Sequence, residues 1–435
     1  MIGSPFAGVI GVGALLLLLA MGTPIGVALG LVGFGGLALL LGSEPALIKS
    51  GVIVFETLSR YELGVLPLFL LMAHLCFAAN ASRDFFEAAA RLVGHRRGGL
   101  ALAAVGACAG FGAISGSSLA TAATVGLVAL PEMRQRGYSS ALATGAVAAG
   151  GTLGQMVPPS GALIVFGIVA EQSIGRLFIA AIVPALTQLL LYCLVILLLC
   201  QLRPEIAPAS QRASWAERRA ALLRVADLAV LVFLVIGGIA LGWFTPPEAA
   251  SVGVVGALLL CAWRRRLRWD SLLHALAETL RTSGMIYLVV IGALIFSVFI
   301  SLSGLPAHIT ALLIGLGSTP TLTLLFMALV LLLLGSVLDG LALMLLTTPI
   351  LLPVIQELGL SPIWFGIFLV RAMEIGFVHP PIGMNLYVIQ EIAKDVRLGR
   401  IFKGVVPFLV SDFLHLLLLI AMPALVLALP KALGV

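Results

Sequence analysis

Charged residues are scarce in this chain, and their scarcity excludes a water-soluble protein. Only 10% of the 435 residues are charged, whereas soluble domains carry about 25%. Hydrophobic residues account for 61%, in apolar stretches that reach about the 20 residues a helix needs to cross a bilayer. The stretches lack the period-two alternation of barrel strands, so the chain is predicted to be an all-α polytopic membrane protein.

Signals of other protein classes are missing as well. The five cysteines lie in apolar segments without CxxC spacing, and we interpret them as buried thiols rather than as disulfide or metal ligands. There is no HExxH motif, no nucleophile elbow and no Gly-rich loop that ends in Lys-Ser or Lys-Thr. These absences argue against an intramembrane enzyme and against ATP hydrolysis by this chain, so an ion gradient is the expected energy source.

Basic residues gather in connectors between the apolar stretches, at 95–97, 203–224 and 264–268. Apart from Trp215, no aromatic residue is interleaved with them, so no nucleic-acid partner is expected. The positive-inside rule places these connectors in the cytoplasm. Ala226–Trp263 is then a helical hairpin whose turn faces the opposite side. The first forty residues lack Lys and Arg, which predicts a retained helix pair rather than a cleavable signal peptide.

Helix-breaking residues repeat along the chain. A shift of 222 residues places Pro158-Pro159 on Pro380-Pro381 and Gly154 on Gly376. Duplicated halves are common in transporters, and by analogy we expect the repeats to be inverted. The expected organisation is N-terminal scaffold helices with an interfacial arm over 1–99, a first repeat over 100–202, a cytoplasmic linker over 203–225, scaffold helices with a second arm over 226–319, and a second repeat over 320–435.

Each half contains an apolar stretch that small polar residues interrupt, at Gly110–Thr124 and at 334–349. Such a pattern is typical of a re-entrant helical hairpin with its tip at membrane depth. Non-helical backbone is tolerated there only when it is buried in protein or lines a cavity, so both tips are expected near a site. For one cluster alone, a tight crossing of membrane helices is an equally good explanation.

Two short charged segments, 82–97 and 265–281, precede the repeats. Apolar residues recur at helical spacing in the first. Each segment is either a helix that lies in the membrane interface or a cytoplasmic connector helix, and the sequence leaves both open.

The first tip offers hydroxyl oxygens and close backbone approach for a sodium ion, from Gly112, Ser115, Gly116, Ser117, Ser118 and Thr121. The second tip carries Asp339 at the position equivalent to Ser117. A carboxylate in an apolar run costs on the order of 3 kcal/mol on insertion scales. The pattern therefore favours a functional cation ligand over a hydrogen-bond anchor at Asp339.

The Pro-Pro pairs should unwind their helices, because proline removes a backbone donor. Carbonyl groups become available as ligands at Gly154, Met156, Gly376 and His379. The side chain of His379 is either a hydrogen-bonded spectator or a proton-linked group. Asn385 either orients a substrate or caps the following helix.

Arg371 and Glu374 lie three residues apart, on one face of an otherwise apolar helix. Either they neutralise each other, or Arg371 holds an anionic substrate directly or indirectly. Asp412 and His415 share a face of the last long helix without a counterpart in the first half, and we interpret them as structural.

Four groups of segments carry a family resemblance: Ala113–Thr124, Gly150–Gly154 with Val157–Ser160, Leu338-Asp339 with Thr348–Pro353, and Glu374–Gly376 with Pro380–Asn385. Together they resemble the large membrane subunit of the TRAP (tripartite ATP-independent periplasmic) transporters. The resemblance implies a Na⁺-coupled, elevator-type permease of the bacterial inner membrane. It also implies a small four-helix membrane subunit, expected as a separate chain, and a periplasmic binding protein that delivers an organic anion, usually a carboxylate.

The residue pattern and the resemblance together assign three groups of site residues. The first sodium site comprises Gly112, Ser115, Gly116, Ser117, Ser118, Gly154, Met156 and Pro158. The second comprises Gly335, Ser336, Asp339, Gly376, His379 and Met384. Substrate binding is assigned to Thr121, Ser160, Arg371 and Asn385. No cofactor other than Na⁺ is expected. His379 departs from the family's usual Thr, which puts the geometry of the second sodium site in question, and Arg371 replaces a commonly polar amide position.

Two other interpretations compete. A stand-alone sodium–dicarboxylate carrier of the same broad architecture would need no binding protein. A purely structural membrane subunit would not account for Asp339 or for the paired breaks.

Overall fold

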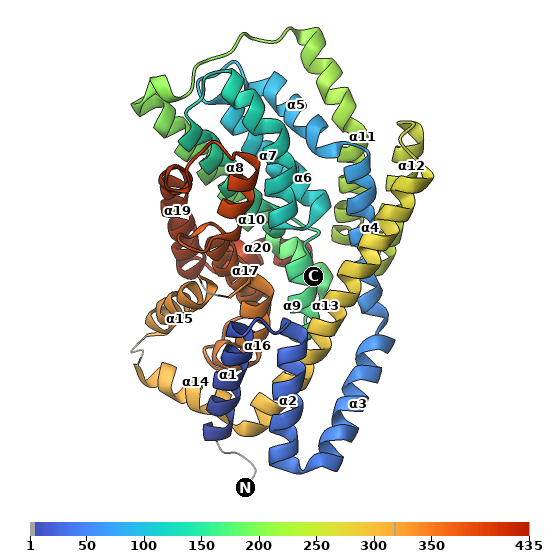
Figure 1. The fold of residues 1–435 in the computed structure, drawn as a ribbon, viewed down its shortest axis with the longest axis vertical. Helices are drawn as coiled ribbons and strands as arrows, with labels where there is room; N and C mark the ends of the chain where they lie inside the picture. The colour runs from blue at the N-terminus through green and yellow to red at the C-terminus, as the bar shows by residue number, and fades with distance from the viewer. Residues whose placement is uncertain (1–4, 317–318, 337, 435) are drawn as a thin grey trace.

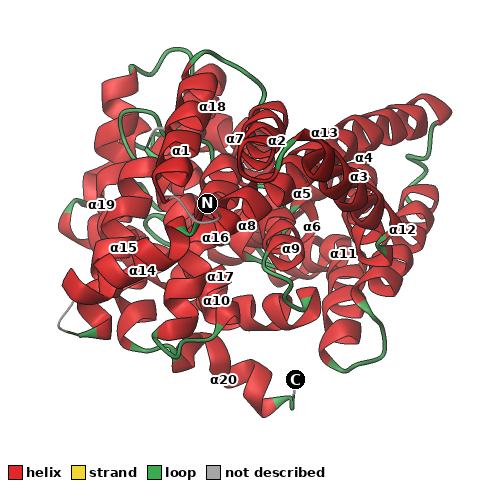
Figure 2. Cartoon of the chain, turned by 90° about the horizontal axis from the view of Figure 1, so that it is seen from below, coloured by secondary structure: helices red, strands yellow, loops and turns green. Residues whose placement is uncertain are grey.

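The computed structural model describes residues 5–316, 319–336 and 338–434, and every regular element in this part of the chain is a helix (Figures 1 and 2). Seven of the helices are long and apolar enough to cross a membrane, and α8 with α9 forms a bent pair that passes the same test. The predicted all-α polytopic class is confirmed.

The first half of the chain ends in a hairpin, a broken helix and a long helix. Its elements are α1 (Pro5–Ala20), α2 (Ile25–Leu41), α3 (Ser43–Ser59), η1 (Tyr61–Gly64), α4 (Val65–Ala78), α5 (Ala81–Val93), α6 (Gly99–Ser115), α7 (Ser118–Gln135), α8 (Ser140–Met156), α9 (Gly161–Val169), α10 (Ile174–Leu202) and η2 (Pro204–Ile206).

The second half closes with the same order of elements. Its helices are α11 (Trp215–Ala240), α12 (Pro246–Trp263), α13 (Trp269–Ser303), α14 (Leu305–Leu316), α15 (Pro320–Gly335), α16 (Gly340–Glu357), α17 (Pro362–Val378), α18 (Met384–Ile392), α19 (Leu398–Ala421) and α20 (Ala424–Ala432). Shifted by 222 residues, the bounds of α7 and α8 coincide with those of α16 and α17. In Figure 1, α6 and α7 occupy the upper half of the molecule, whereas α15 and α16 occupy the lower half.

The helices begin where the sequence supplies caps. Ser117 and Asp339, equivalent in the repeat, are the N-caps of α7 and α16. At α11, Ser214 and Glu217 form a capping box, in which each satisfies a backbone N–H of the other. This box starts α11 at Trp215, inside the segment predicted as the linker.

The predicted hairpin within Ala226–Trp263 is confirmed, because α11 and α12 pack together across a short turn. The two charged segments fold differently from each other. The first forms the separate helix α5, whereas the second is largely the N-terminal part of α13, which continues without a break for 35 residues.

Helix α8 lies at the centre of the part that carries the predicted site. It contacts α6, α7 and α10 of its own half and α17 and α19 of the other. Nearly all of its residues are buried. The first Pro-Pro pair is buried in this core, whereas in the second pair Pro380 is partly buried and Pro381 is exposed.

Candidate functional site

The first tip and the first break meet at a crossing of two glycines. A Cβ atom added to Gly112 of α6 would lie 2.7 Å from the Cα of Gly154 in α8. A Cβ on Gly154 would lie 2.3 Å from Thr121 Oγ1 and 2.7 Å from the carbonyl oxygen of Ser117. Only glycine allows the two backbones to approach this closely. The predicted first-site residues of the tip and of the break are therefore brought together.

Several oxygen atoms converge at this crossing. Ser115 Oγ lies 2.7 Å from Thr121 Oγ1 and donates to the carbonyl of Ser117 at 3.4 Å. Gly116, in the left-handed region at φ 59°, ends α6 and turns the chain into α7. Thr121, assigned from sequence to the substrate, is fully buried among these first-site oxygens.

The Pro-Pro pair removes the helical donors of two carbonyls beside the tip. Proline has no N–H, so Pro158 and Pro159 leave the carbonyls four residues earlier, those of Gly154 and Gln155, without their helical donors. Met156 is the last residue of α8, and Ser160 caps α9 through a bond from Leu163 N at 3.3 Å. The break is thus the end of one helix and the start of the next, bent by 41°.

The crossing yields a direct test of this geometry. Gly154→Ala is expected to destabilise the protein by about 1–3 kcal/mol, because the added methyl has no room against Thr121 and Ser117. Gly106→Ala in α6 is the matched control, since a Cβ there meets no atom within 4 Å and alanine favours a helix. Thermal unfolding in detergent measures both, and equal stability of the two variants would contradict the crossing.

The second tip approaches the second break in the same way. A Cβ on Gly376 of α17 would lie 2.6 Å from the carbonyl oxygen of Gly335, the last residue of α15. Ser336 follows as the C-cap, and its Oγ donates to Leu333 O of its own helix at 2.7 Å. Val337, between Ser336 and Leu338, lies outside the described residues. The two halves therefore share a tip-to-break contact as well as helix bounds.

Asp339 lies at the start of α16, and one of its oxygens is used in the cap. Its Oδ1 accepts from the backbone N–H groups of Leu341, at 2.8 Å, and Ala342, at 3.2 Å. Asp339 can therefore be both a hydrogen-bond anchor and a cation ligand, because the helix cap uses Oδ1 and not Oδ2. His379 ends α17, and its carbonyl accepts from Gly383 N at 2.9 Å. Met384 is the first residue of α18.

A chain of polar side chains joins the first tip to the second half. Asn385 Nδ2 donates to Ser118 Oγ at 3.0 Å and to the carbonyl of Ala148 at 3.1 Å. Ser118 Oγ in turn donates to Glu374 Oε2 at 3.2 Å. Asn385 and Glu374 are both fully buried. Hairpin α6–α7 and the broken helix α17–α18 are therefore tied together.

The sequence left two interpretations of Arg371, and the first of them, neutralisation by Glu374, is not what the structure shows. The guanidinium of Arg371 forms an ion pair with Asp412 of α19, and the two side chains are 1% and 0% exposed. Gln188 of α10 donates to the same Asp412 oxygen at 2.8 Å. Glu374 instead accepts from Ser118. Arg371 and Glu374 do lie one turn apart on α17, but the ion pair of Arg371 is with a carboxylate on α19.

The role of Asp412 as the counter-ion of Arg371 was missed from the sequence. Next to it, His415 Nε2 lies 2.9 Å from Thr187 Oγ1 of α10. The sequence did indicate that Asp412 and His415 have partners, because polar residues in an apolar membrane helix pair with other groups inside the protein. Sequence spacing alone does not say which helix supplies them.

All four side chains predicted to hold the substrate are buried in this structure. Thr121, Ser160 and Asn385 are 0% exposed and Arg371 is 1% exposed. Arg371 and Asn385 have partners within the protein. These four side chains are thus enclosed by protein, whereas the tip residues Ser115, Ser117 and Asp339 are partly exposed.

The fold and the site together define a helical membrane transporter permease. The chain belongs to the family described as the tripartite ATP-independent periplasmic transporter, DctM component, which it matches over residues 12–425. It is therefore the large permease subunit of a TRAP transporter, a multi-pass protein of the bacterial inner membrane and not an enzyme.

Similar proteins span nearly the whole chain. It is 36% identical over 401 residues to the C4-dicarboxylate TRAP transporter large permease protein DctM of Pseudomonas aeruginosa, covering 92% of this chain and 93% of that protein. It is 32% identical over 417 residues to the sialic acid TRAP transporter large permease protein SiaM of Vibrio cholerae, covering 95% and 96%. Among solved structures, the Alcanivorax borkumensis YdaH transporter has the same general fold, with a TM-score of 0.63, 16% identity and coverage of 87% and 88%.

Proposed function

We propose that this chain imports an organic anion, a carboxylate, driven by the sodium gradient and by an elevator movement. The observation that carries the proposal is the repeated contact of a hairpin tip with a Pro-Pro break, at Gly112–Gly154 and at Gly335–Gly376. Each contact gathers hydroxyl, carbonyl or carboxylate oxygens at the ends of discontinuous helices. Such ends coordinate sodium in secondary transporters.

The two proposed sodium sites differ in charge. The first offers neutral oxygens from Ser115, Ser117 and Thr121 and the carbonyl of Gly154. The second offers the free oxygen of Asp339 and the carbonyls near Gly376. A carboxylate ligand strengthens the attraction for a cation in a low-dielectric setting. Sodium binding at the second site should therefore depend mainly on one residue, Asp339.

The two halves are proposed to be inverted repeats. The coincident bounds of α7 and α16 and of α8 and α17 support the repeat, and the opposite positions of the two hairpins in Figure 1 support its inversion. The links Asn385–Ser118 and Ser118–Glu374 join parts of both halves. Such a joined unit is suited to move as one body against the scaffold helices.

The substrate is proposed to bind between the tips, near Ser160 and Asn385 and beside Thr121. Arg371 acts on it indirectly, since its charge is already paired with Asp412. It fixes α17 against α19 and so positions the second break. The relatives' names include C4-dicarboxylate, sialic acid and isethionate transporters, all of which carry an anionic group.

Two partners are proposed, a small membrane subunit and a periplasmic binding protein. One relative supports the first, the isethionate TRAP transporter permease protein DctMQ of Oleidesulfovibrio alaskensis, which is 32% identical over 420 residues. This chain covers 64% of that protein, which leaves room in the relative for a further membrane segment.

Reconstitution in liposomes tests the proposal. The chain, its small subunit and a binding protein loaded with radiolabelled succinate or sialic acid should give uptake only with an inward Na⁺ gradient. Replacing Na⁺ by K⁺ should abolish uptake, and unchanged uptake would contradict sodium coupling. Uptake by the chain alone, without the other two components, would instead identify a stand-alone carrier.

A further inference from the structure

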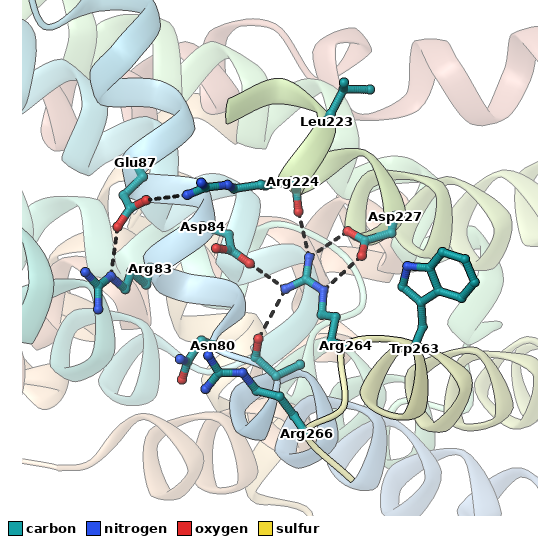
Figure 3. Close-up of a pocket in the computed structure, with 11 residues that line it drawn as sticks. Asn80, Arg83, Asp84, Glu87, Leu223, Arg224, Asp227, Trp263, Arg264 and Arg266 are labelled. Carbon is teal, nitrogen blue, oxygen red and sulfur yellow. Dashed lines mark hydrogen bonds and ion pairs between the residues drawn. The ribbon is translucent and has the colours of Figure 1, made fainter. Parts of the chain in front are cut away.

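A cavity of about 500 Å³ lies away from the transport site, where α5 meets α11 and α12 (Figure 3). Its walls come from the start of α5, the third and fourth turns of α11 and the C-terminal end of α12 with the connector that follows. That connector, 264–268, is one that the positive-inside rule places in the cytoplasm. The cavity is therefore at the cytoplasmic surface of the membrane.

Arg264 lies at the floor of the cavity, and all three nitrogens of its guanidinium donate hydrogen bonds within the protein. It forms ion pairs with Asp84 of α5 and Asp227 of α11, and its side chain is 14% exposed. It also donates to the carbonyls of Ala79, at 3.1 Å, and Arg224, at 2.6 Å. Two carboxylates thus more than neutralise one guanidinium, and together they hold α5, α11 and α12 in place.

The rim of the cavity carries an excess of positive charge. Arg83 and Arg224 share one carboxylate, Glu87, and their side chains are 65% and 67% exposed. Arg266 lies 2.7 Å from the side-chain amide of Asn80, and Figure 3 shows this pair at the lower edge of the cavity, with Asp84 and Arg264 between it and Arg224. Three arginines on the rim therefore face one glutamate, and their guanidinium groups match the geometry of a phosphate.

An apolar surface leads away from this rim. Val255, Leu259 and Trp263 are spaced four residues apart on α12, so they share one face, and all three are exposed. Trp263 lines the cavity, as does the exposed Leu223 of α11. Tryptophan is enriched where a membrane helix meets the headgroup level. A soluble anion would make no contact with this apolar surface, whereas the acyl chain of a lipid would pack along it.

We propose that this cavity binds the headgroup of an anionic phospholipid, with the phosphate among Arg83, Arg224 and Arg266 and an acyl chain along Val255, Leu259 and Trp263. Basic pockets between membrane helices on the cytoplasmic side are suited to such lipids. The lipid would fasten the arm helix α5 to the scaffold helices at the membrane surface. The site is independent of the sodium and substrate sites proposed above.

Native mass spectrometry of the full-length chain, purified in detergent, tests the proposal. Phosphatidylglycerol should bind at least fivefold more tightly than phosphatidylcholine. Each of Arg224→Gln and Arg266→Gln should weaken phosphatidylglycerol binding by about fivefold, the effect of one arginine near an anionic membrane surface. Binding of phosphatidylcholine should stay unchanged.

The matched control is Arg397→Gln with Arg400→Gln, two exposed arginines at the start of α19 that do not line the cavity. An equal loss in this control, or equal binding of the two lipids by the unmodified chain, would overturn the proposal. Displacement of phosphatidylglycerol by equimolar glycerol phosphate would do the same, since it would indicate a site for soluble phosphates.

If the co-purified small subunit prevents phosphatidylglycerol from binding, this face is covered by a protein and not by a lipid, and the proposal is wrong. The comparison of phosphatidylglycerol with phosphatidylcholine on the unmodified chain tests the proposal even if a variant folds poorly.

Discussion

Asp339→Asn is expected to abolish sodium-dependent uptake while leaving helix α16 intact. Asparagine is as good an N-cap as aspartate, so the bonds from Leu341 and Ala342 can persist. The substitution removes the charge that the proposed second site needs. Loss of a residue that only supports a metal ligand costs 10- to 100-fold in affinity, so loss of the ligand's charge should lower the apparent Na⁺ affinity by about 100-fold or more. Uptake into liposomes at graded Na⁺ concentration measures this.

Asp339→Ala separates the two roles of this carboxylate. It removes the cap as well as the charge and should add about 1 kcal/mol of destabilisation. Asp270→Asn is the control, because it removes an exposed carboxylate at the start of α13. If Asp339→Asn keeps full sodium dependence and only Asp339→Ala is impaired, the residue is a helix cap and the cation assignment is wrong.

Breaking the Arg371–Asp412 ion pair should have the largest effect on stability. Arg371→Met leaves Asp412 buried without its cation, and Asp412→Leu leaves Arg371 buried without its anion. Removing one partner of a buried pair costs about 3–5 kcal/mol. The double variant, which replaces both charges by apolar side chains of similar volume, should recover most of that loss. Thermal unfolding of all three in detergent gives the coupling between the two residues.

Transport by the double variant shows what the pair does beyond stability. If Arg371 positions α17 for the substrate, the double variant should be stable and bind Na⁺ but transport substrate poorly. Equal losses in substrate transport and in Na⁺ binding would mark a purely structural pair. Single variants as stable as the unmodified chain would contradict the buried pairing itself.

Much of the architecture follows from local features of the sequence. Long apolar runs without strand periodicity require helices, because the membrane interior offers no other partner for backbone groups. The 222-residue repeat of Pro-Pro pairs predicted two equivalent breaks. The bounds of the helices before them, α8 and α17, coincide after this shift, and those of the helices after them, α9 and α18, differ by one residue. Whether α5 lies in the interface remains an expectation, as do the roles of the sodium and substrate residues.

The sequence by itself determined the helical class, the membrane setting, the α11–α12 hairpin and the places where helices break, since each depends on hydrophobicity or on backbone chemistry within a few residues. Only the tertiary structure decided that Arg371 pairs with Asp412 and that Glu374 turns to Ser118. It also decided that Arg264 joins α5 to α11 and α12. A buried charge pairs with whichever opposite charge packing brings within reach, and between separate helices that distance is a property of the packed fold and not of the spacing along the chain.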